Sequence, residues 1–243
     1  MKKLVIMFTL LIILCGCKSS EVSFGKNSVR LHMPGETSKQ SVDFRYFGET
    51  EDIELLGLKD YSSNIKVEPK YIIDYKKPMQ HNDYYILNAE IPIFEGMKVK
   101  FSTITYKLGK EEKEADVGIF EFEKNGLEME EYALSNNYNG KKSEFCIDIK
   151  TDGLGNLKKV EAINPDFQVE TRIQNLVNTE METDTRIYFS YSIPREYDFV
   201  TTNFCYTFEN NGKEELRYGR GFVTLGKDGT IVSSGNFMRS AVG

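Results

Sequence analysis

The sequence contains no tryptophan among its 243 residues, only two histidines and only six prolines. It also lacks an excess of positive charge, because 31 Lys and Arg residues stand against 37 Asp and Glu residues, a formal net charge of −6. Nucleic-acid-binding proteins usually carry a basic patch, so this balance argues against nucleic acid as a partner. The scarcity of proline and of low-complexity sequence excludes a long stalk. A composition of 40% hydrophobic and 28% charged residues is typical of a globular protein.

The sequence also lacks a hydrophobic run long enough to cross a membrane as a helix, which takes about 20 residues. Its main apolar run comes at the start, where Met1-Lys2-Lys3 is followed by residues 4–14, all apolar except Thr9. A basic start followed by about 7–15 apolar residues is the pattern of a secretory signal. The sequence therefore predicts a signal peptide over residues 1–16 and export from the cytoplasm.

The segment that ends this run, Leu14-Cys15-Gly16-Cys17, resembles the lipobox of bacterial lipoproteins. An aliphatic residue lies three positions before Cys17 and a small residue directly before it, whereas bulky Leu14 precedes Cys15. The resemblance implies that Cys17 receives a diacylglycerol thioether and becomes the first residue of the mature chain, held at the membrane by its acyl chains. We therefore expect an extracytoplasmic protein on the outer face of the cell membrane or on the outer membrane. An ordinary signal peptide with an incidental cysteine is the alternative.

The mature chain contains an internal repeat with a period of about one hundred residues. Residues 85–91 and 187–193 both alternate apolar and polar side chains, and a proline follows each stretch. Further on, residues 104–108 match 204–208, and Gly109-Lys110-Glu111-Glu112 recurs as Gly212-Lys213-Glu214-Glu215. These matches predict a duplicated unit. We place a lipidated tether at residues 17–26, a first domain at 27–126 and a second domain at 127–243.

Most segments of both units alternate in the manner of half-buried β-strands, as in Val42-x-Phe44-x-Tyr46 and Phe145-x-Ile147-x-Ile149. Turn sequences such as Asn210-Asn211-Gly212 supply the positive φ angles that tight hairpins need. The pattern predicts an all-β fold of two tandem β-sandwiches, which resemble immunoglobulin domains. The missing tryptophan departs from true immunoglobulin domains. Only residues 171–180 show a spacing compatible with a short helix.

Two cysteines remain in the body of the protein, Cys146 and Cys205. Export brings them into a compartment that permits disulfides, and their separation is similar to that of the immunoglobulin disulfide. Against a bond, Phe145 and Phe204 belong to the inward-facing series of their strands, which turns both cysteines outward on opposite sheets. The sequence therefore leaves a disulfide between them open.

The remaining patterns offer no chemistry. His32 is expected to be a solvated strand residue, and His81 lies in a polar loop. The spacing of histidines and cysteines matches no zinc site. No Gly-x-Ser-x-Gly nucleophile elbow, phosphate-binding loop or calcium loop of the EF-hand kind is present. We therefore predict no catalytic residue, no metal and no cofactor.

A concentration of tyrosines in the first unit is the one sign of recognition. Tyr84 and Tyr85 stand near other tyrosines, and exposed tyrosine suits protein or glycan contacts. We take these two as a candidate binding patch. The sequence as a whole predicts a lipid-anchored, non-enzymatic interaction module of the bacterial envelope, whose protein or glycan partner is unknown. The alternatives are a membrane-anchored hydrolase with an all-β active site, and a solute-binding lipoprotein.

Overall fold

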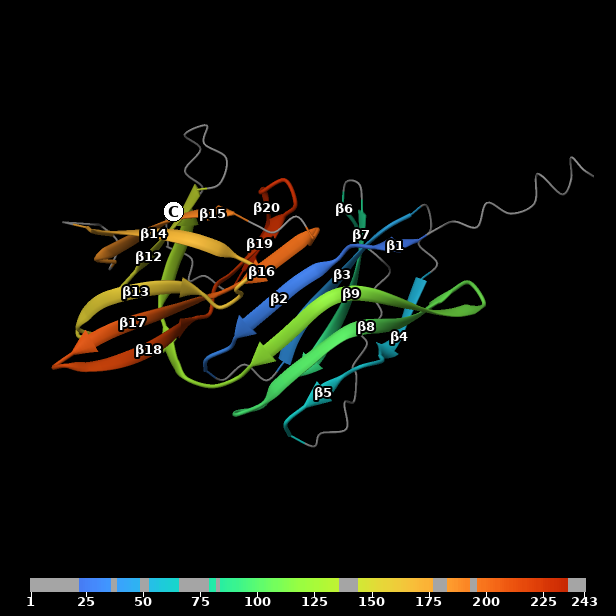
Figure 1. Ribbon diagram of the computed structural model, residues 1–243, viewed down its shortest axis with the longest axis horizontal. Coiled ribbons are helices and arrows are strands. Elements are labelled where there is room, and N and C mark those ends of the chain that lie inside the picture. The colour runs from blue at the N-terminus through green and yellow to red at the C-terminus, as the bar shows by residue number, and fades with distance from the viewer. Residues whose placement is uncertain are drawn as a thin grey trace, which may run out of the picture.

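The computed structural model describes residues 22–35, 39–48, 53–65, 79–81, 84–135, 144–176, 183–192 and 196–235. Cys17 and the predicted signal peptide lie outside these residues. Every regular element in the described ranges is a β-strand. The strands form two sandwiches that follow one another along the long axis of the molecule (Figure 1). The predicted all-β fold of two tandem immunoglobulin-like sandwiches is confirmed.

The first sandwich packs two sheets against each other. One sheet has the order β1 (Ser23–Phe24), β3 (Lys39–Phe47), β7 (Tyr84–Pro92) and β6 (Met79–His81). The other has the order β2 (Asn27–His32), β9 (Glu111–Glu123), β8 (Lys98–Leu108) and β4 (Ile53–Leu58), with β5 (Ser62–Ser63) paired to β8. Strand β2 runs parallel to β9, and the other pairs within this sandwich are antiparallel.

The second sandwich repeats these two four-strand orders, although here the strand of the parallel pair comes first of the two edge strands along the chain rather than second. Its first sheet has the order β11 (Glu131–Ser135), β12 (Glu144–Ile149), β15 (Thr185–Ser192) and β14 (Gln168–Asn175). Its second sheet has the order β10 (Leu127–Met129), β18 (Lys213–Gly219), β17 (Phe204–Asn210) and β13 (Asn156–Ala162), and β10 is parallel to β18. Both sandwiches therefore carry the two strand orders of an immunoglobulin domain, A-B-E-D and G-F-C, with the first strand divided between the sheets.

The sequence matches fall on equivalent strands of the two sandwiches. Residues 85–91 lie in β7 and residues 187–192 in β15, while residues 104–108 lie in β8 and 204–208 in β17. Gly109 and Gly212 occupy the two equivalent hairpins with φ values of 61° and 76°. A side chain is disfavoured at such angles, so both turns retain glycine.

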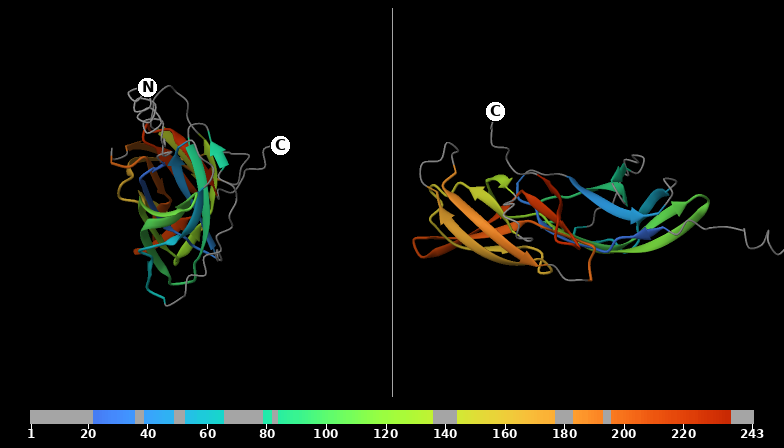
Figure 2. Two further views of the ribbon diagram at one scale, coloured as in Figure 1. Left: turned by 90° about the vertical axis from the view of Figure 1, so that its right-hand side faces the viewer. Right: turned by 90° about the horizontal axis from the view of Figure 1, so that it is seen from above.

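The two sandwiches share a sheet, which the sequence did not reveal. Strands β16 (Phe199–Thr202), β19 (Phe222–Gly226) and β20 (Ile231–Gly235) extend the β2 sheet of the first sandwich. Their inward residues, such as Val200 and Leu225, still belong to the core of the second. The connection is a parallel pairing of β16 with β2, which yields one eight-stranded sheet running through both units (Figure 2). The boundary at residue 127 therefore divides the chain but not the sheets.

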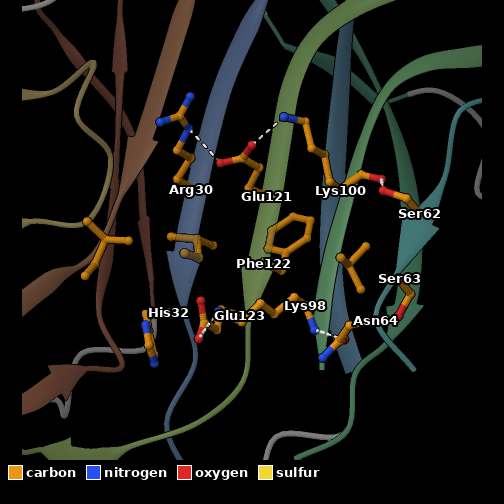
Figure 3. Close-up of a pocket in the computed structure, with 13 residues that line it drawn as sticks. Arg30, His32, Ser62, Ser63, Asn64, Lys98, Lys100, Glu121, Phe122 and Glu123 are labelled. Atoms are coloured by element: carbon orange, nitrogen blue, oxygen red, sulfur yellow. Dashed lines mark hydrogen bonds and ion pairs between the residues drawn. The ribbon is translucent and has the colours of Figure 1, made fainter. Parts of the chain in front are cut away.

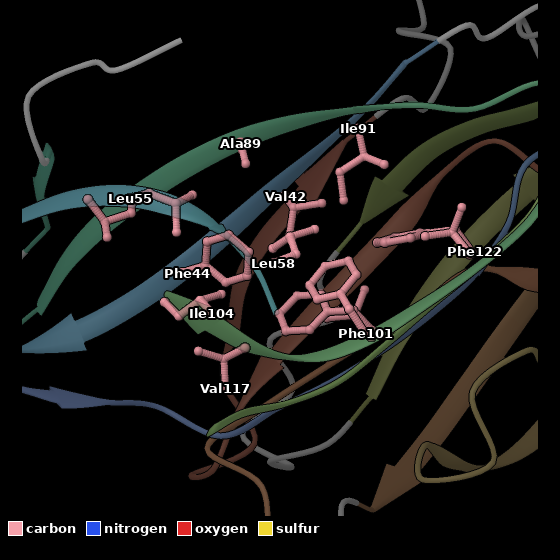
Figure 4. Close-up of a cluster of buried hydrophobic side chains, with 14 of the residues drawn as sticks. Val42, Phe44, Leu55, Leu58, Ala89, Ile91, Phe101, Ile104, Val117 and Phe122 are labelled. Carbon is pink, nitrogen blue, oxygen red and sulfur yellow. The ribbon is translucent and has the colours of Figure 1, made fainter. Parts of the chain in front are cut away.

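Each sandwich has its own hydrophobic core. The buried apolar residues of the first core lie between Val29 and Phe122, and those of the second between Met129 and Leu225. In the first core, Phe44 of β3 faces Phe101 of β8, with ring centroids 6.1 Å apart (Figure 4). Phe101 in turn stacks on Phe120, with centroids 4.8 Å apart. The alternating residues of the sequence repeat fill both cores because period-two alternation directs them to one face of each sheet.

Two details differ from the sequence-based expectations. The segment assigned to the tether already contributes β1, whose Phe24 packs edge-on against Tyr106 with centroids 4.9 Å apart. Ser23 and Phe24 of the segment predicted as a tether therefore belong to the first sandwich. Residues 171–175, which were expected to begin a short helix, form the end of strand β14 instead. There Ile173 pairs with Ile187, so sheet pairing outweighs a weak local helical spacing.

Candidate binding site

A groove with a volume of about 490 Å³ lies on the outer face of the first sandwich (Figure 3). Its floor is formed by β2, β9 and β8, and the β5 segment Ser62-Ser63-Asn64 borders it on one side. Ile163, which belongs to the second sandwich, also lines the groove. The groove therefore depends on both halves of the chain and on the sheet that joins them.

The polar floor follows from strand alternation. Leu31, Val99 and Phe122 point into the first core. Their neighbours in the sequence must then point outward. The outward side chains on the groove floor are Arg30 and His32 of β2, Lys98 and Lys100 of β8, and Glu121 and Glu123 of β9.

The charges on this floor are paired across the strands. The Glu121 carboxylate lies 3.1 Å from the Arg30 Nε and 2.8 Å from the Lys100 Nζ, so it joins β2 to β8 (Figure 3). One row further along, the Lys98 Nζ lies 2.8 Å from the Glu123 carboxylate. The lysine side chains keep 62% and 61% of their surface exposed, against 31% and 33% for the glutamates. The groove therefore presents cationic groups to solvent on a protein whose net charge is negative.

Glu123 is held in its ionised form. Partial burial alone would raise the pKa of its carboxyl. Hydrogen bonds from Lys98 and Asn125, together with the positive charge of Lys98, outweigh burial and lower the pKa below its usual value. A carboxylate in this state suits charge pairing and does not suit proton donation at neutral pH.

His32 is not a solvated residue, as the sequence suggested, because only 9% of its surface is exposed. Its ring stacks on the ring of Tyr218 from the second sandwich, with centroids 3.6 Å apart and an interplanar angle of 6°. Its Nε2 lies 3.0 Å from the carbonyl oxygen of Asn125. The second sandwich covers this end of β2, which the pattern of β2 alone could not show. His81, expected in a loop, is the last residue of β6.

Two buried asparagines connect the sandwiches, and sequence reasoning missed both. The Asn203 Nδ2 donates to the carbonyl oxygens of His32 and Gly219 at 2.5 and 2.7 Å. The Asn164 Nδ2 donates to the carbonyl oxygen of Ser28 at 2.9 Å and to that of Thr201 at 3.0 Å. The available signal was the position of Asn203, which interrupts the apolar alternation between Phe199 and Phe208.

Tyr84 and Tyr85 lie on opposite faces of β7 and do not form one patch. The Tyr85 ring stacks on that of buried Tyr46, with centroids 5.2 Å apart, at the margin of the first core. The Tyr84 ring packs edge-on against Phe199 of the second sandwich, with centroids 5.7 Å apart. Both side chains are half-buried, and the contact of Tyr84 belongs to the junction between the sandwiches.

Cys146 and Cys205, the two cysteines in the described part of the chain, do not form a disulfide. They lie on opposite sheets of the second sandwich, in β12 and β17. Cys146 points away from the core, as expected, yet only 2% of its surface is exposed. Burial and the nearby charge of Glu161 raise the pKa of the Cys205 thiol. A thiol with a raised pKa is a poor nucleophile.

Glu131 is the most perturbed carboxyl group of the described residues, and it lies inside the second sandwich. Its Oε1 accepts a hydrogen bond from the Tyr206 hydroxyl at 2.5 Å, and its Oε2 accepts one from the Gly221 N–H at 2.6 Å. Complete burial raises the pKa of Glu131 to about 8, against the opposing effect of these two hydrogen bonds. These two hydrogen bonds join β11 to β17 and to the segment between β18 and β19.

The described residues hold no group of three or more His, Cys, Asp or Glu side chains that could bind a metal ion. Within the same residues, no helix is long and apolar enough to cross a membrane. The Gly153-Leu154-Gly155 segment lies in the turn that connects β12 to β13, which belong to different sheets of the second sandwich.

Comparison with known proteins identifies no family for this chain. No protein-family model and no curated protein match the chain. Among solved structures, the chain is similar to a marsupial T cell receptor. The two are 7% identical, with a TM-score of 0.22, and the match covers 82% of this chain and 94% of that chain.

Proposed function

We propose that this protein is a lipid-anchored, extracytoplasmic binding module that recognises a protein partner in the bacterial envelope through the groove on its first sandwich. The observation that carries this proposal is the exposed cationic floor formed by Lys98 and Lys100 on an otherwise acidic molecule. Such a floor suits an acidic segment of a partner protein. A glycan fits less well, because the aromatic ring beneath the floor, that of Phe122, points into the core.

The anchor would hold the first sandwich close to the membrane. Five residues separate Cys17 from Ser23, where β1 begins. At about 3.3–3.6 Å per extended residue, the tether reaches roughly 20 Å. In Figure 1, β1 lies at the end of the first sandwich opposite the second sandwich. The second sandwich would then extend away from the lipid surface, and the groove on the first sandwich would lie between the lipid surface and the second sandwich.

A non-enzymatic role is supported by the state of the carboxyl groups. A hydrolase of the alternative kind predicts a carboxylate pair or a triad in one cleft, with strongly shifted pKa values. Among the described residues, the carboxyl group of Glu131 has a raised pKa but is completely buried, whereas that of Glu123 in the groove has a lowered pKa. A solute-binding lipoprotein is less well supported, since a shallow polar groove encloses little of a small ligand.

The groove is tested with an acidic peptide as the probe. Fluorescence anisotropy of labelled poly-L-glutamate should show binding that weakens as salt is added, because the contact is electrostatic. The variant K98E/K100E should lose this binding. Its matched control is K59E, which reverses an exposed lysine paired to Glu114 away from the groove. Equal binding by all three proteins would rule out the groove as the recognition surface.

The anchor is tested separately by the intact mass of the N-terminal peptide from membrane-fractionated protein. The expected result is a chain that begins at Cys17 and carries acyl groups. An unmodified chain that begins at Met1 would overturn both the anchor and the location.

A further inference from the structure

Strand β14 presents a long edge without a partner in the described part of the chain. All eight of its residues, Gln168–Asn175, pair with β15, and β14 is the terminal strand of its sheet. Nearly all of these residues are exposed. An unpaired strand edge offers a row of free N–H and C=O groups to any other strand that can reach it.

The other edges of the described sheets are protected and β14 is not. Strands β1, β6 and β10 have only two or three residues. Strands β4, β11, β13 and β20 each pair with a register shift, which distorts the edge. Short length and irregular register both discourage strand addition. The β14–β15 pairing has neither feature, so β14 is the edge that remains open to a further strand.

The side chains of β14 form two distinct rows. Glu170 and Arg172 lie on the outer face, where the Arg172 guanidinium is positioned 3.9 Å from the centre of the Tyr188 ring. Val169, Thr171 and Ile173 lie on the face that looks toward the core, opposite Tyr191, Phe189 and Ile187. Ile173 nevertheless keeps 37% of its surface exposed. An apolar residue on the core side is therefore incompletely covered.

We propose that β14 pairs antiparallel with β14 of a second copy of this chain, about a two-fold axis at Thr171. This register places Glu170 opposite Arg172 twice, Val169 opposite Ile173 twice, and Thr171 opposite itself. The charges on the outer face attract, and Val169 of the second copy covers the exposed Ile173. A two-fold interface must be self-complementary, and this sequence is.

The neighbouring registers are excluded by charge. Two residues that face each other across an antiparallel pair must both direct their N–H and C=O groups toward the partner strand, or both direct them away from it. Because consecutive residues of a strand alternate in this direction, a two-fold axis passes at a residue and never between two. An axis at Glu170 places this glutamate opposite itself, and an axis at Arg172 places two arginines together. Like charges directly opposite each other destabilise a strand pair. The Thr171 register also uses seven residues of the strand, from Gln168 to Gln174.

Charge reversal tests this dimer. Sedimentation of the full chain in detergent, across a concentration series, should show a monomer–dimer equilibrium. E170R or R172E should each weaken the dimer about tenfold, because two repulsive pairs replace two attractive ones. The double variant E170R/R172E should restore it, since the pairs are merely exchanged. A monomer at every concentration, or a dimer that ignores these changes, would overturn the proposal.

Cross-linking tests the register independently of affinity. In the proposed pair, the two Thr171 Cα atoms lie about 4.5–5.5 Å apart, within the range that a disulfide bridges. T171C should therefore form a covalent dimer on mild oxidation. V169C is the matched control, because its two copies are separated by several residues along the strands and should stay monomeric. A dimer that forms with V169C and not with T171C would exclude the Thr171 axis.

Discussion

The side chain of Asn203 hydrogen-bonds both main-chain groups of His32. Its Nδ2 donates to the His32 carbonyl oxygen at 2.5 Å, and its Oδ1 accepts from the His32 N–H at 3.0 Å. Asn203 lies at the break between β16 and β17, and the same Nδ2 also donates to the Gly219 carbonyl oxygen at 2.7 Å. The amide thus replaces strand pairing at the point where the chain passes from one sandwich to the other.

We expect N203A to lower the free energy of unfolding by about 2–4 kcal/mol. The change leaves one buried N–H and two buried carbonyl oxygens without their partner, and each such loss costs about 1–3 kcal/mol before relaxation. Urea denaturation followed by circular dichroism measures this loss. N203D serves as the comparison, because it keeps the acceptor and removes the donor. Stability equal to the wild type in both variants would show that the amide does not join the sandwiches.

Stability should decrease as the pH rises from about 4.5 to about 8, through the titration of Glu131. Its pKa is about 8 in the folded protein, whereas the usual value is 4.5. Between these values the folded state holds a proton that the unfolded state has released. Stabilisation is therefore complete below pH 4.5 and is lost as the pH passes 8. The size of the effect is roughly 3–5 kcal/mol, at 1.36 kcal/mol for each unit of pKa.

The variant E131Q isolates this contribution, because glutamine remains neutral throughout the range. Urea titrations at several pH values should show a wild-type stability that falls relative to E131Q between pH 4.5 and 8. Other titrating groups are common to both proteins and cancel in the difference. Parallel pH profiles for the two proteins would mean that Glu131 is ionised in the fold.

Gly219 should tolerate no side chain. A Cβ at this position would lie 2.0 Å from the Glu131 Oε1, and two hydrogen bonds hold that carboxyl in place. G219A is therefore expected to cost about 3 kcal/mol or more. G109A is the control, since a Cβ there meets no atom within 4 Å and the cost of a positive φ is about 1 kcal/mol. Thermal or urea unfolding measures the stability of both variants. If Glu131 were free to move aside, G219A would be more stable than G109A.

Both body cysteines should be recovered as thiols from the native protein. Protein that is denatured without reductant and alkylated should carry the label on Cys146 and on Cys205, because these residues lie on opposite sheets. Peptide mass spectrometry measures this directly. A pair of peptides linked through the two residues would contradict the arrangement of β12 and β17.

The local pattern of the chain was enough to predict the sheets but not their junction. Alternation in residues 85–91 and 187–193 placed Leu87 and Ile187 in their cores, because side-chain direction in a strand is set by the backbone alone. His32 and Tyr84 were misjudged for the opposite reason. Their burial depends on Tyr218 and Phe199, which are more than one hundred residues away in the chain.

The sequence by itself determined the all-β class and the repeat of about one hundred residues, since period-two alternation and hairpin glycines act over a few residues. It also contains the segment at Cys17 that resembles a lipobox, a resemblance that depends on consecutive residues and not on the fold. The tertiary structure decided what the two copies became. Pairing of β16 with β2 joins the sheets of the two sandwiches, buries Asn203 and shapes the groove around Lys98 and Lys100. Such long-range pairing depends on which edges meet in space, and no local pattern records that.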